Sequence, residues 1–157
     1  MTDKMSDAIE RNIAEHGWHC QSVHGDADFP PFAYSIGWGM TRTWPEFLIV
    51  GAARPSLSTS MIWRVWESGR RPCPGEVRDD ILDGYDCPMR AVDLSWFPFL
   101  FGRAIDAYMT RGLKPFEAVQ CIWPTTAHVL PWEPEASEQF VKRQPILDRP
   151  MQREPGT

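Results

Sequence analysis

The sequence predicts an α+β domain in which a largely antiparallel or mixed sheet is packed by two long helices and an N-terminal helix. Two observations carry this prediction. The early strand-like segments follow one another with only loops between them, and strands and helices do not alternate regularly enough for a doubly wound parallel sheet. A chain of 157 residues can bury one core. We expect a single domain over residues 1–148 and a flexible tail over 149–157.

The first element is an amphipathic helix over residues 4–16. Met5, Ile9 and Ile13 recur every four residues in a polar segment, the spacing that lines one helical face. Gly17 follows where a helix would end.

Three short strands come next. Large and small side chains alternate over residues 32–36, which indicates a strand with two different faces. The run 47–50 is entirely apolar and favours a central strand buried on both faces. Residues 18–23 form the remaining strand, and loops are expected at 24–31 and 38–45.

The first long helix covers residues 55–68. Pro55 suits a first helical turn, an apolar stripe follows, and Gly69 provides the stop. Residues 69–84 are polar and acidic, so we interpret them as a solvated connection.

The remaining elements are a strand, a second long helix and a final strand. Pro88 interrupts the strand over 85–92 and predicts an edge position or a bulge. Asp93 or Ser95 would cap the second helix, which carries an aromatic face and ends at Gly112. The final strand covers 116–123.

Charge and hydropathy exclude several classes of protein. The chain has 21 acidic and 16 basic residues, a net charge of −5 that argues against a nucleic-acid binder. Thirteen of those basic residues are arginine, so a local anion-binding fork remains open. No apolar run is long enough to span a membrane. The polar start lacks the pattern of a secretory signal, and a cytoplasmic location is expected.

Metal and nucleophile motifs are incomplete. The four cysteines are spaced without a Cys-x-x-Cys pair, and we expect four buried thiols. His16 and His19 lack further ligands at recognisable spacing, so no metal site is predicted. His19 and Cys20 are neighbours on a strand and point to opposite faces, which argues against a catalytic pair. Neither a Gly-x-Ser-x-Gly elbow nor a phosphate-binding loop is present.

The eight tryptophans are the most informative feature of the composition. Trp63, Trp66 and Trp96 fit helix-to-sheet packing, whereas the other five fall at strand ends or in loops, where pocket walls arise. We therefore predict an aromatic-walled pocket for a small molecule or a peptide segment, although each tryptophan taken singly also fits core packing. The predicted ligand-binding residues are Trp18, Tyr34, Ser35, Trp38, Trp123 and Trp132. His19, Glu46 and His16 are the candidates for polar anchoring or acid-base catalysis.

Several motifs together resemble the bacterial domain-of-unknown-function 4262 family, over about residues 9–148. They are the runs 16–19 (HGWH), 31–37 (PFAYSIG), 45–51 (PEFLIVG), 84–85 (GY), 92–96 (VDLSW), 120–124 (QCIWP), 131–134 (PWEP) and 144–148 (QPILD). The family name carries no activity that the resemblance could imply.

Residues 32–37 are also similar to the opening strand of flavin-reductase-like split barrels. That similarity implies flavin as a cofactor and Tyr34, Ser35, Gly37 and Arg42 as its contacts. The following Trp38-Gly39-Met40 departs from the pattern of such strands, and nothing else in the sequence requires a cofactor.

Three functions follow as alternatives. The first is binding of a small molecule or peptide in the aromatic pocket. The second is an enzyme that uses acid-base or flavin-assisted chemistry there. The third is a protein–protein interaction module, with a homodimer as one form.

Overall fold

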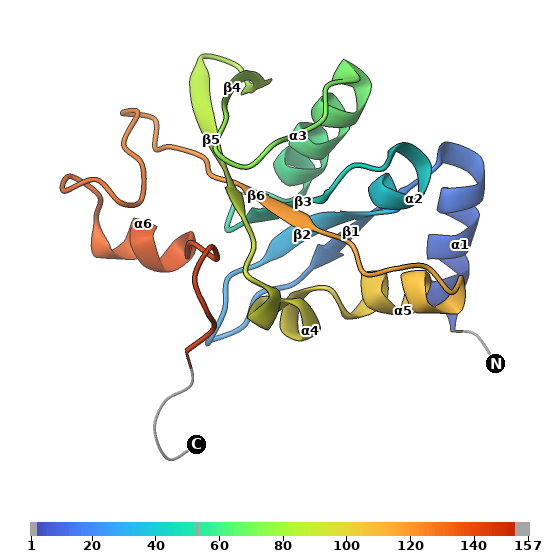
Figure 1. Cartoon of the computed structure of the whole chain (residues 1–157). Helices are drawn as coiled ribbons and strands as arrows, with labels where there is room; N and C mark the ends of the chain where they lie inside the picture. Colours follow the sequence, from blue (N-terminus) through green and yellow to red (C-terminus); the bar gives the residue numbers. More distant parts are fainter. Residues whose placement is uncertain (1–2, 53, 153–157) are drawn as a thin grey trace.

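The computed structural model describes residues 3–52 and 54–152, which form a six-stranded sheet with helices on both faces (Figure 1). The strand order is β1-β2-β3-β6-β5-β4. β3 and β6 pair in parallel and the other neighbours are antiparallel, which confirms the α+β class and the mixed sheet. The strands are β1 (His19–Val23), β2 (Phe32–Ile36), β3 (Glu46–Val50), β4 (Val77–Leu82), β5 (Tyr85–Ala91) and β6 (Ala118–Cys121).

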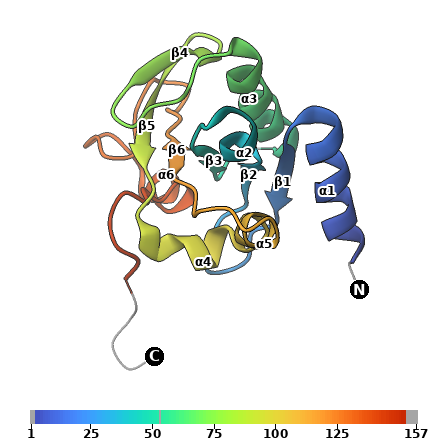
Figure 2. The ribbon, with the colours of Figure 1, turned by 45° about the vertical axis from the view of Figure 1, so that its right-hand side comes forward.

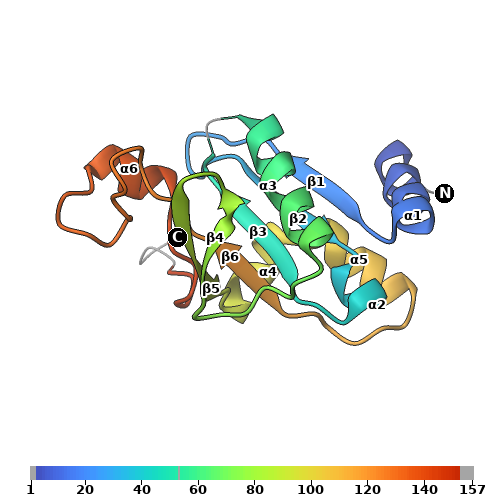
Figure 3. The same cartoon turned by 90° about the horizontal axis from the view of Figure 1, so that it is seen from above.

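The helices form a layer on each side of the sheet. α3 covers one face, while α4 and α5 cover the other (Figures 1 and 3). α2 lies between α3 and α5 at one end of the sheet (Figure 2). The bounds are α1 (Lys4–His16), α2 (Trp38–Arg42), α3 (Pro55–Ser68), the 3₁₀ helix η1 (Leu94–Trp96), α4 (Phe97–Leu100), α5 (Gly102–Thr110) and α6 (Glu138–Arg143).

The two amphipathic helices with clear stops are confirmed. α1 ends at Gly17 and α3 ends at Gly69, and both glycines adopt the left-handed conformation that such stops require. At the start of α1, the Asp3 side chain accepts a hydrogen bond from the Ser6 amide at 2.7 Å.

The prediction of one long helix after Asp93 was wrong, because the chain there breaks into η1, α4 and α5. The backbone leaves the helical conformation at Phe101, with φ −112° and ψ 29°. The Phe101 ring is fully buried against Phe97 and Phe116, at centroid distances of 5.0 and 5.6 Å. The break therefore lets one ring fill the core from between two short helices.

Three further elements differ from the sequence prediction. α2 lies within the segment 38–45 that was expected to be a loop, and β4 lies in the supposed solvated connection 69–84. α6 had no counterpart in the prediction. β4 has only a weak apolar pattern because Arg78 takes one of its two inward positions, where its guanidinium donates to Asp80 at 2.8 and 2.9 Å.

Pro88 lies on an interior strand, so its assignment to an edge strand was wrong. β5 is hydrogen-bonded to β6 on one side and to β4 on the other. The register between β4 and β5 shifts between Arg78 and Leu82, in agreement with the alternative that a bulge accompanies this strand.

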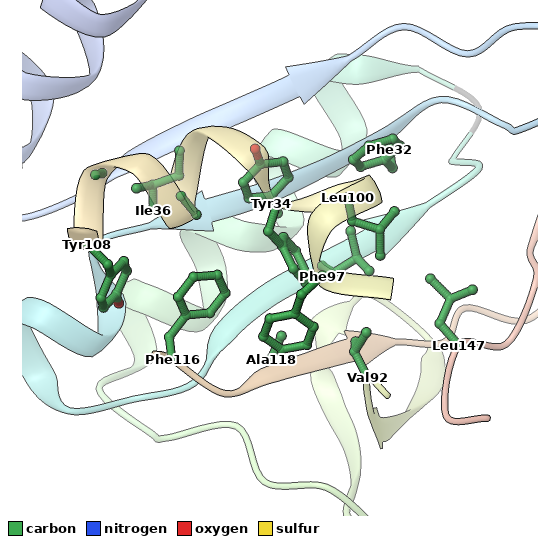
Figure 4. Close-up of a cluster of buried hydrophobic side chains, with 14 of the residues drawn as sticks. Phe32, Tyr34, Ile36, Val92, Phe97, Leu100, Tyr108, Phe116, Ala118 and Leu147 are labelled. Atoms are coloured by element: carbon green, nitrogen blue, oxygen red, sulfur yellow. The ribbon is translucent and has the colours of Figure 1, made fainter. Parts of the chain in front are cut away.

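The sheet separates two apolar cores. Phe32, Tyr34 and Ile36 of β2 face the core beneath α4 and α5, where Phe97 stacks on Phe116 at 5.3 Å (Figure 4). Ala33 faces the core beneath α3. β2 therefore has two different faces, as its alternating sequence indicates.

The first residues of the predicted tail, after residue 148, are hydrogen-bonded to η1. The Trp96 indole donates to the Arg149 carbonyl at 2.8 Å, and the Met151 amide donates to the Ser95 hydroxyl at 2.7 Å. The rest of the predicted tail, residues 153–157, lies outside the described residues. Within the described chain, no helix has the length and apolar character needed to cross a membrane.

Candidate functional site

Glu46 forms a buried polar network at the start of β3. One carboxylate oxygen accepts hydrogen bonds from the Ser35 hydroxyl at 2.7 Å and the Trp38 amide at 3.1 Å. The other accepts from the Gly37 and Gly39 amides, at 3.0 and 3.3 Å, and from the Tyr108 hydroxyl. Glu46 therefore ties β2, the first turn of α2 and α5 together, and we call this set the Glu46 network.

The electrostatics of the Glu46 network suit a carboxylate that holds structure in place. Burial raises the pKa of Glu46, and its hydrogen-bond donors act in the opposite direction, with Tyr108 having the largest effect among them. All five partners are donors, which matches the acceptor-only ionised form. Burial also raises the pKa of Tyr108, and the Glu46 charge adds to that shift. Because its five partners use the lone pairs of both oxygens, Glu46 has little capacity left to accept a proton from a substrate.

Five tryptophans pack into one cluster beneath α3. Trp18 and Trp63 have centroids 4.6 Å apart, and Trp38 stacks on Trp66 at 5.7 Å. The Trp18 and Trp38 indole nitrogens are buried and have no hydrogen-bond partner in the described structure. The members of this Trp cluster are Trp18, Trp38, Trp44, Trp63 and Trp66. The sequence predicts a pocket role for Trp18 and Trp38 and a packing role for Trp63 and Trp66, yet the fold brings all four together.

Arg42 closes the exposed side of the Trp cluster. Its guanidinium carbon lies 3.4 Å from the Trp66 ring centroid and 4.8 Å from that of Trp44. One guanidinium nitrogen also donates to the Trp66 carbonyl at 2.6 Å. Arg42 thus fastens α2 to the end of α3.

His16 ends α1 and His19 begins β1. His16 is exposed at the end of α1. His19 is half-buried. Its Nδ1 lies 2.8 Å from the side-chain nitrogen Nδ2 of Asn12, and its Nε2 lies 3.1 Å from the side-chain oxygen Oε1 of Gln21. Their catalytic role therefore stays a prediction, and the structure shows no direct contact of either with Glu46.

His19 should make folding stability depend on pH. Burial lowers the pKa of His19, while its bond to Gln21 acts in the opposite direction. The folded state thus favours the neutral His19 ring. The stability that this neutral ring contributes is fully present above the ordinary histidine pKa of about 6.5 and is lost as the pH falls below it. In urea unfolding at pH 7.5 and 5.0, His19→Gln should lose less stability on acidification than wild type, whereas His16→Gln should behave as wild type. An equal loss in His19→Gln and wild type would contradict this assignment.

A cavity of about 370 Å³ lies where the parallel strands β3 and β6 end. The two strands point in the same direction, so the chain after Val50 and the chain after Cys121 meet at one edge of the sheet. The cavity is lined mainly by apolar and aromatic groups. We call it the Trp123 cavity, and its lining is Ala52, Leu57, Met61, Leu82, Tyr85, Trp123, Pro124, Thr125, Thr126, Phe140 and Arg143.

Trp123 is held rigidly in this wall. Its indole nitrogen donates to the Val50 carbonyl at 2.8 Å. The Gln144 side chain brackets the Trp123 backbone by accepting from its amide at 2.8 Å and donating to its carbonyl at 2.7 Å. Phe140 packs edge-on to the Trp123 ring at 5.3 Å. The ring is consequently fixed before any ligand arrives.

The model of the family described as "Domain of unknown function (DUF4262)" matches residues 12–137. The chain belongs to this family. No match was found among curated proteins or solved structures. The similarity of residues 32–37 to flavin-reductase-like split barrels is not shown by any of these comparisons.

Most of the predicted ligand-binding residues of this DUF4262 domain lie away from the Trp123 cavity. Trp123 contributes to its wall, whereas Trp132 is 44% exposed and its ring lies 4.6 Å beneath the Arg90 guanidinium. The others are at most 1% exposed, so a role in ligand binding stays a prediction for them. They are Trp18, Tyr34, Ser35 and Trp38.

Sequence reasoning missed Tyr85 and Phe140 as cavity residues of the DUF4262 domain. Tyr85 begins β5 and belongs to the Gly84-Tyr85 run, one of the motifs that resemble the DUF4262 family, which implies no function for it. Phe140 lies on α6, a six-residue helix whose Ser137 cap was the available signal. The amphipathic pattern of so short a helix is too brief to distinguish it from a loop.

The cysteines of the DUF4262 domain differ from the expected four buried thiols. Cys87 and Cys121 are fully buried, but Cys20 is half-buried and Cys73 is exposed. Burial raises the pKa of the Cys20 thiol to about 11, which makes it a poor nucleophile. Within the described residues, no group of three or more His, Cys, Asp or Glu side chains is placed to hold a metal ion.

Proposed function

We propose that this DUF4262 domain binds a planar, uncharged aromatic small molecule in the Trp123 cavity. The observation that carries the proposal is the position of this apolar cavity at the carboxyl ends of the central parallel strands, with Trp123 fixed in its wall. Ligands of open sheets with parallel strands commonly bind outside these strand ends. The volume of about 370 Å³ is within the usual range for a small-ligand pocket.

The lining supports an uncharged ligand with a flat ring. Trp123, Tyr85 and Phe140 offer ring surfaces, and the Tyr85 ring is backed by His128 at a centroid distance of 4.8 Å. Thr125 and Thr126 supply hydroxyl groups that can orient one polar atom of the ligand. Arg143 is the one charged side chain among the described lining residues, and its Nε donates to the Gly51 carbonyl at 2.9 Å.

Binding is favoured over acid-base catalysis at this site. Among the residues that the structure describes, no histidine and no carboxylate lines the Trp123 cavity. Glu46, the predicted candidate for proton transfer, is not among the lining residues and accepts hydrogen bonds from five donors. The residues of this cavity therefore support ligand binding better than acid-base catalysis.

Blocking the cavity tests the proposal. Thr126 is exposed at the rim, so Thr126→Phe places a ring in the cavity without crowding the core. We expect it to weaken binding of 2-naphthol, measured by isothermal titration calorimetry, by at least about tenfold, because the added ring competes for the same apolar surface. Ala127→Phe is the matched control, since it adds the same ring at an exposed neighbour outside the lining.

Two outcomes would contradict the proposal. One is an absence of 2-naphthol binding to the wild-type protein at millimolar concentration. The other is an equal loss of affinity in Thr126→Phe and Ala127→Phe, which would show that the cavity itself is not the binding site.

A further inference from the structure

A second and larger cavity, of about 760 Å³, lies at the opposite ends of β3 and β6. It is bounded by the residues just before these two strands, by α2 and by the end of α5. Figure 3 shows α2 and α5 at this end of the sheet and α6 at the other. We call it the Tyr108 cavity, and it is lined by Gly39, Met40, Thr43, Trp44, Pro45, Arg71, Tyr108, Gly112, Leu113, Lys114, Pro115, Phe116 and Glu117.

The inner wall of the Tyr108 cavity is aromatic and rigid. Tyr108 packs against Phe116 at a centroid distance of 4.7 Å, and its hydroxyl is held by Glu46. Trp44 is fixed edge-on to Trp66 at 5.6 Å. A flat ligand would therefore meet ring surfaces that are already in place, which limits the entropy lost on binding.

The charges around this cavity favour an anion. Arg71 and Lys114 are exposed in its lining, and neither has an ion-pair partner within the described part of the chain. Within the described part of the chain, Glu117 is the one acidic side chain in the lining, which leaves an excess of one positive charge among the lining side chains. This excess contrasts with the net charge of −5 of the whole chain.

The end of α5 does not cancel this excess. The carbonyls at a helix end carry partial negative charge when they lack donors. Here the Tyr108 carbonyl accepts from the amides of Arg111 and Leu113, at 3.1 and 3.0 Å, and the Met109 carbonyl accepts from the Gly112 amide at 3.0 Å. These bonds satisfy the Tyr108 and Met109 carbonyls, so Arg71 and Lys114 are the main charges at the rim of the cavity.

We propose that the Tyr108 cavity is a separate binding site for a planar aromatic anion, a carboxylate or a phosphate monoester. The ring would lie against Trp44 and Phe116, and the anionic group would lie between Arg71 and Lys114. This site is distinct from the Trp123 cavity. Its ligand carries a negative charge, which the two cations at the rim recognise, whereas the ligand of the Trp123 cavity is uncharged.

Calorimetry with matched probes tests the site. The probes are 2-naphthoate, 2-naphthyl phosphate and the uncharged 2-naphthamide, and the Thr126→Phe background removes any contribution of the Trp123 cavity. At low ionic strength we expect both anions to bind about tenfold more tightly than the amide, and 0.5 M salt to remove most of that difference. Comparison of the two anions distinguishes a carboxylate ligand from a phosphate ligand.

Two changes of charge in the lining should shift the affinity for 2-naphthoate in opposite directions. The double variant Arg71→Gln/Lys114→Gln should weaken 2-naphthoate binding about tenfold, while Glu117→Gln should strengthen it about two- to threefold, because screened surface charges have effects of this order. The control is Lys4→Gln/Arg11→Gln, which removes the same two charge types from exposed positions on α1. Equal affinity for 2-naphthoate and 2-naphthamide, or equal effects of the two double variants, would overturn the proposal.

Discussion

Glu46→Gln is expected to lower the free energy of unfolding by about 2–4 kcal/mol, because hydrogen bonds to a charged acceptor are lost and buried donors are left without an acceptor. The glutamine amide group is a donor, and wherever it points it faces groups that also donate, such as Ser35 with Trp38 on one side or Gly37 with Gly39 on the other. Unfolding in urea, followed by far-ultraviolet circular dichroism, measures the loss.

The control for Glu46→Gln is Glu117→Gln. Glu117 is an exposed carboxylate just before β6, next to the segment that pairs with Glu46, and its replacement should change stability by less than about 0.5 kcal/mol. A comparably small loss in Glu46→Gln would mean that its five donors find water instead, and would refute the structural role of the Glu46 network.

Gly51→Ala is expected to cost about 2–4 kcal/mol and to weaken ligand binding in the Trp123 cavity. Gly51 has a φ of +75°, a conformation that strains an L side chain, and an added Cβ would overlap the Arg143 carbonyl. The Gly51 carbonyl also accepts from the Arg143 side chain at 2.9 Å. The clash would push the end of α6 away from β3, and with it Phe140 from the cavity.

Gly69→Ala separates the clash from the backbone strain. Gly69 has a similar φ of +68° at the end of α3, but an added Cβ there meets nothing within 4 Å. It should therefore cost only the strain, about 1 kcal/mol. Thermal or urea unfolding of both variants gives the comparison, and equal losses would show that α6 is not packed tightly against Gly51.

The elements predicted correctly are those whose local sequence is sufficient to specify them. α1 and α3 have an apolar stripe and a glycine stop, and β3 is a continuous apolar run that the sheet buries on both faces. The elements that were missed depend on distant partners. α2 begins with amides bound by Glu46, and β4 has Arg78 at an inward position satisfied by Asp80, Ser68 and the Arg70 carbonyl.

The candidate sites divide in the same way. The tryptophan-rich sequence predicts an aromatic-walled pocket, and of the residues predicted to bind a ligand, Trp123 lies in the wall of the Trp123 cavity. The sequence could not indicate which rings meet one another. Trp18 and Trp66 are 48 positions apart in the sequence, yet their rings pack at 5.7 Å because α3 crosses the sheet above β1 and β2.

The α+β class and the helices with clear stops can be predicted from local patterns, because hydrophobic periodicity and glycine stops are local properties, and short motifs are enough to indicate the DUF4262 family. The folded chain, by contrast, packs most of the tryptophans into a core cluster, surrounds Glu46 with five donors and forms cavities at both ends of the parallel pair. The physical reason is that burial and hydrogen-bond partners are set by contacts between residues far apart in the chain, which no local pattern encodes.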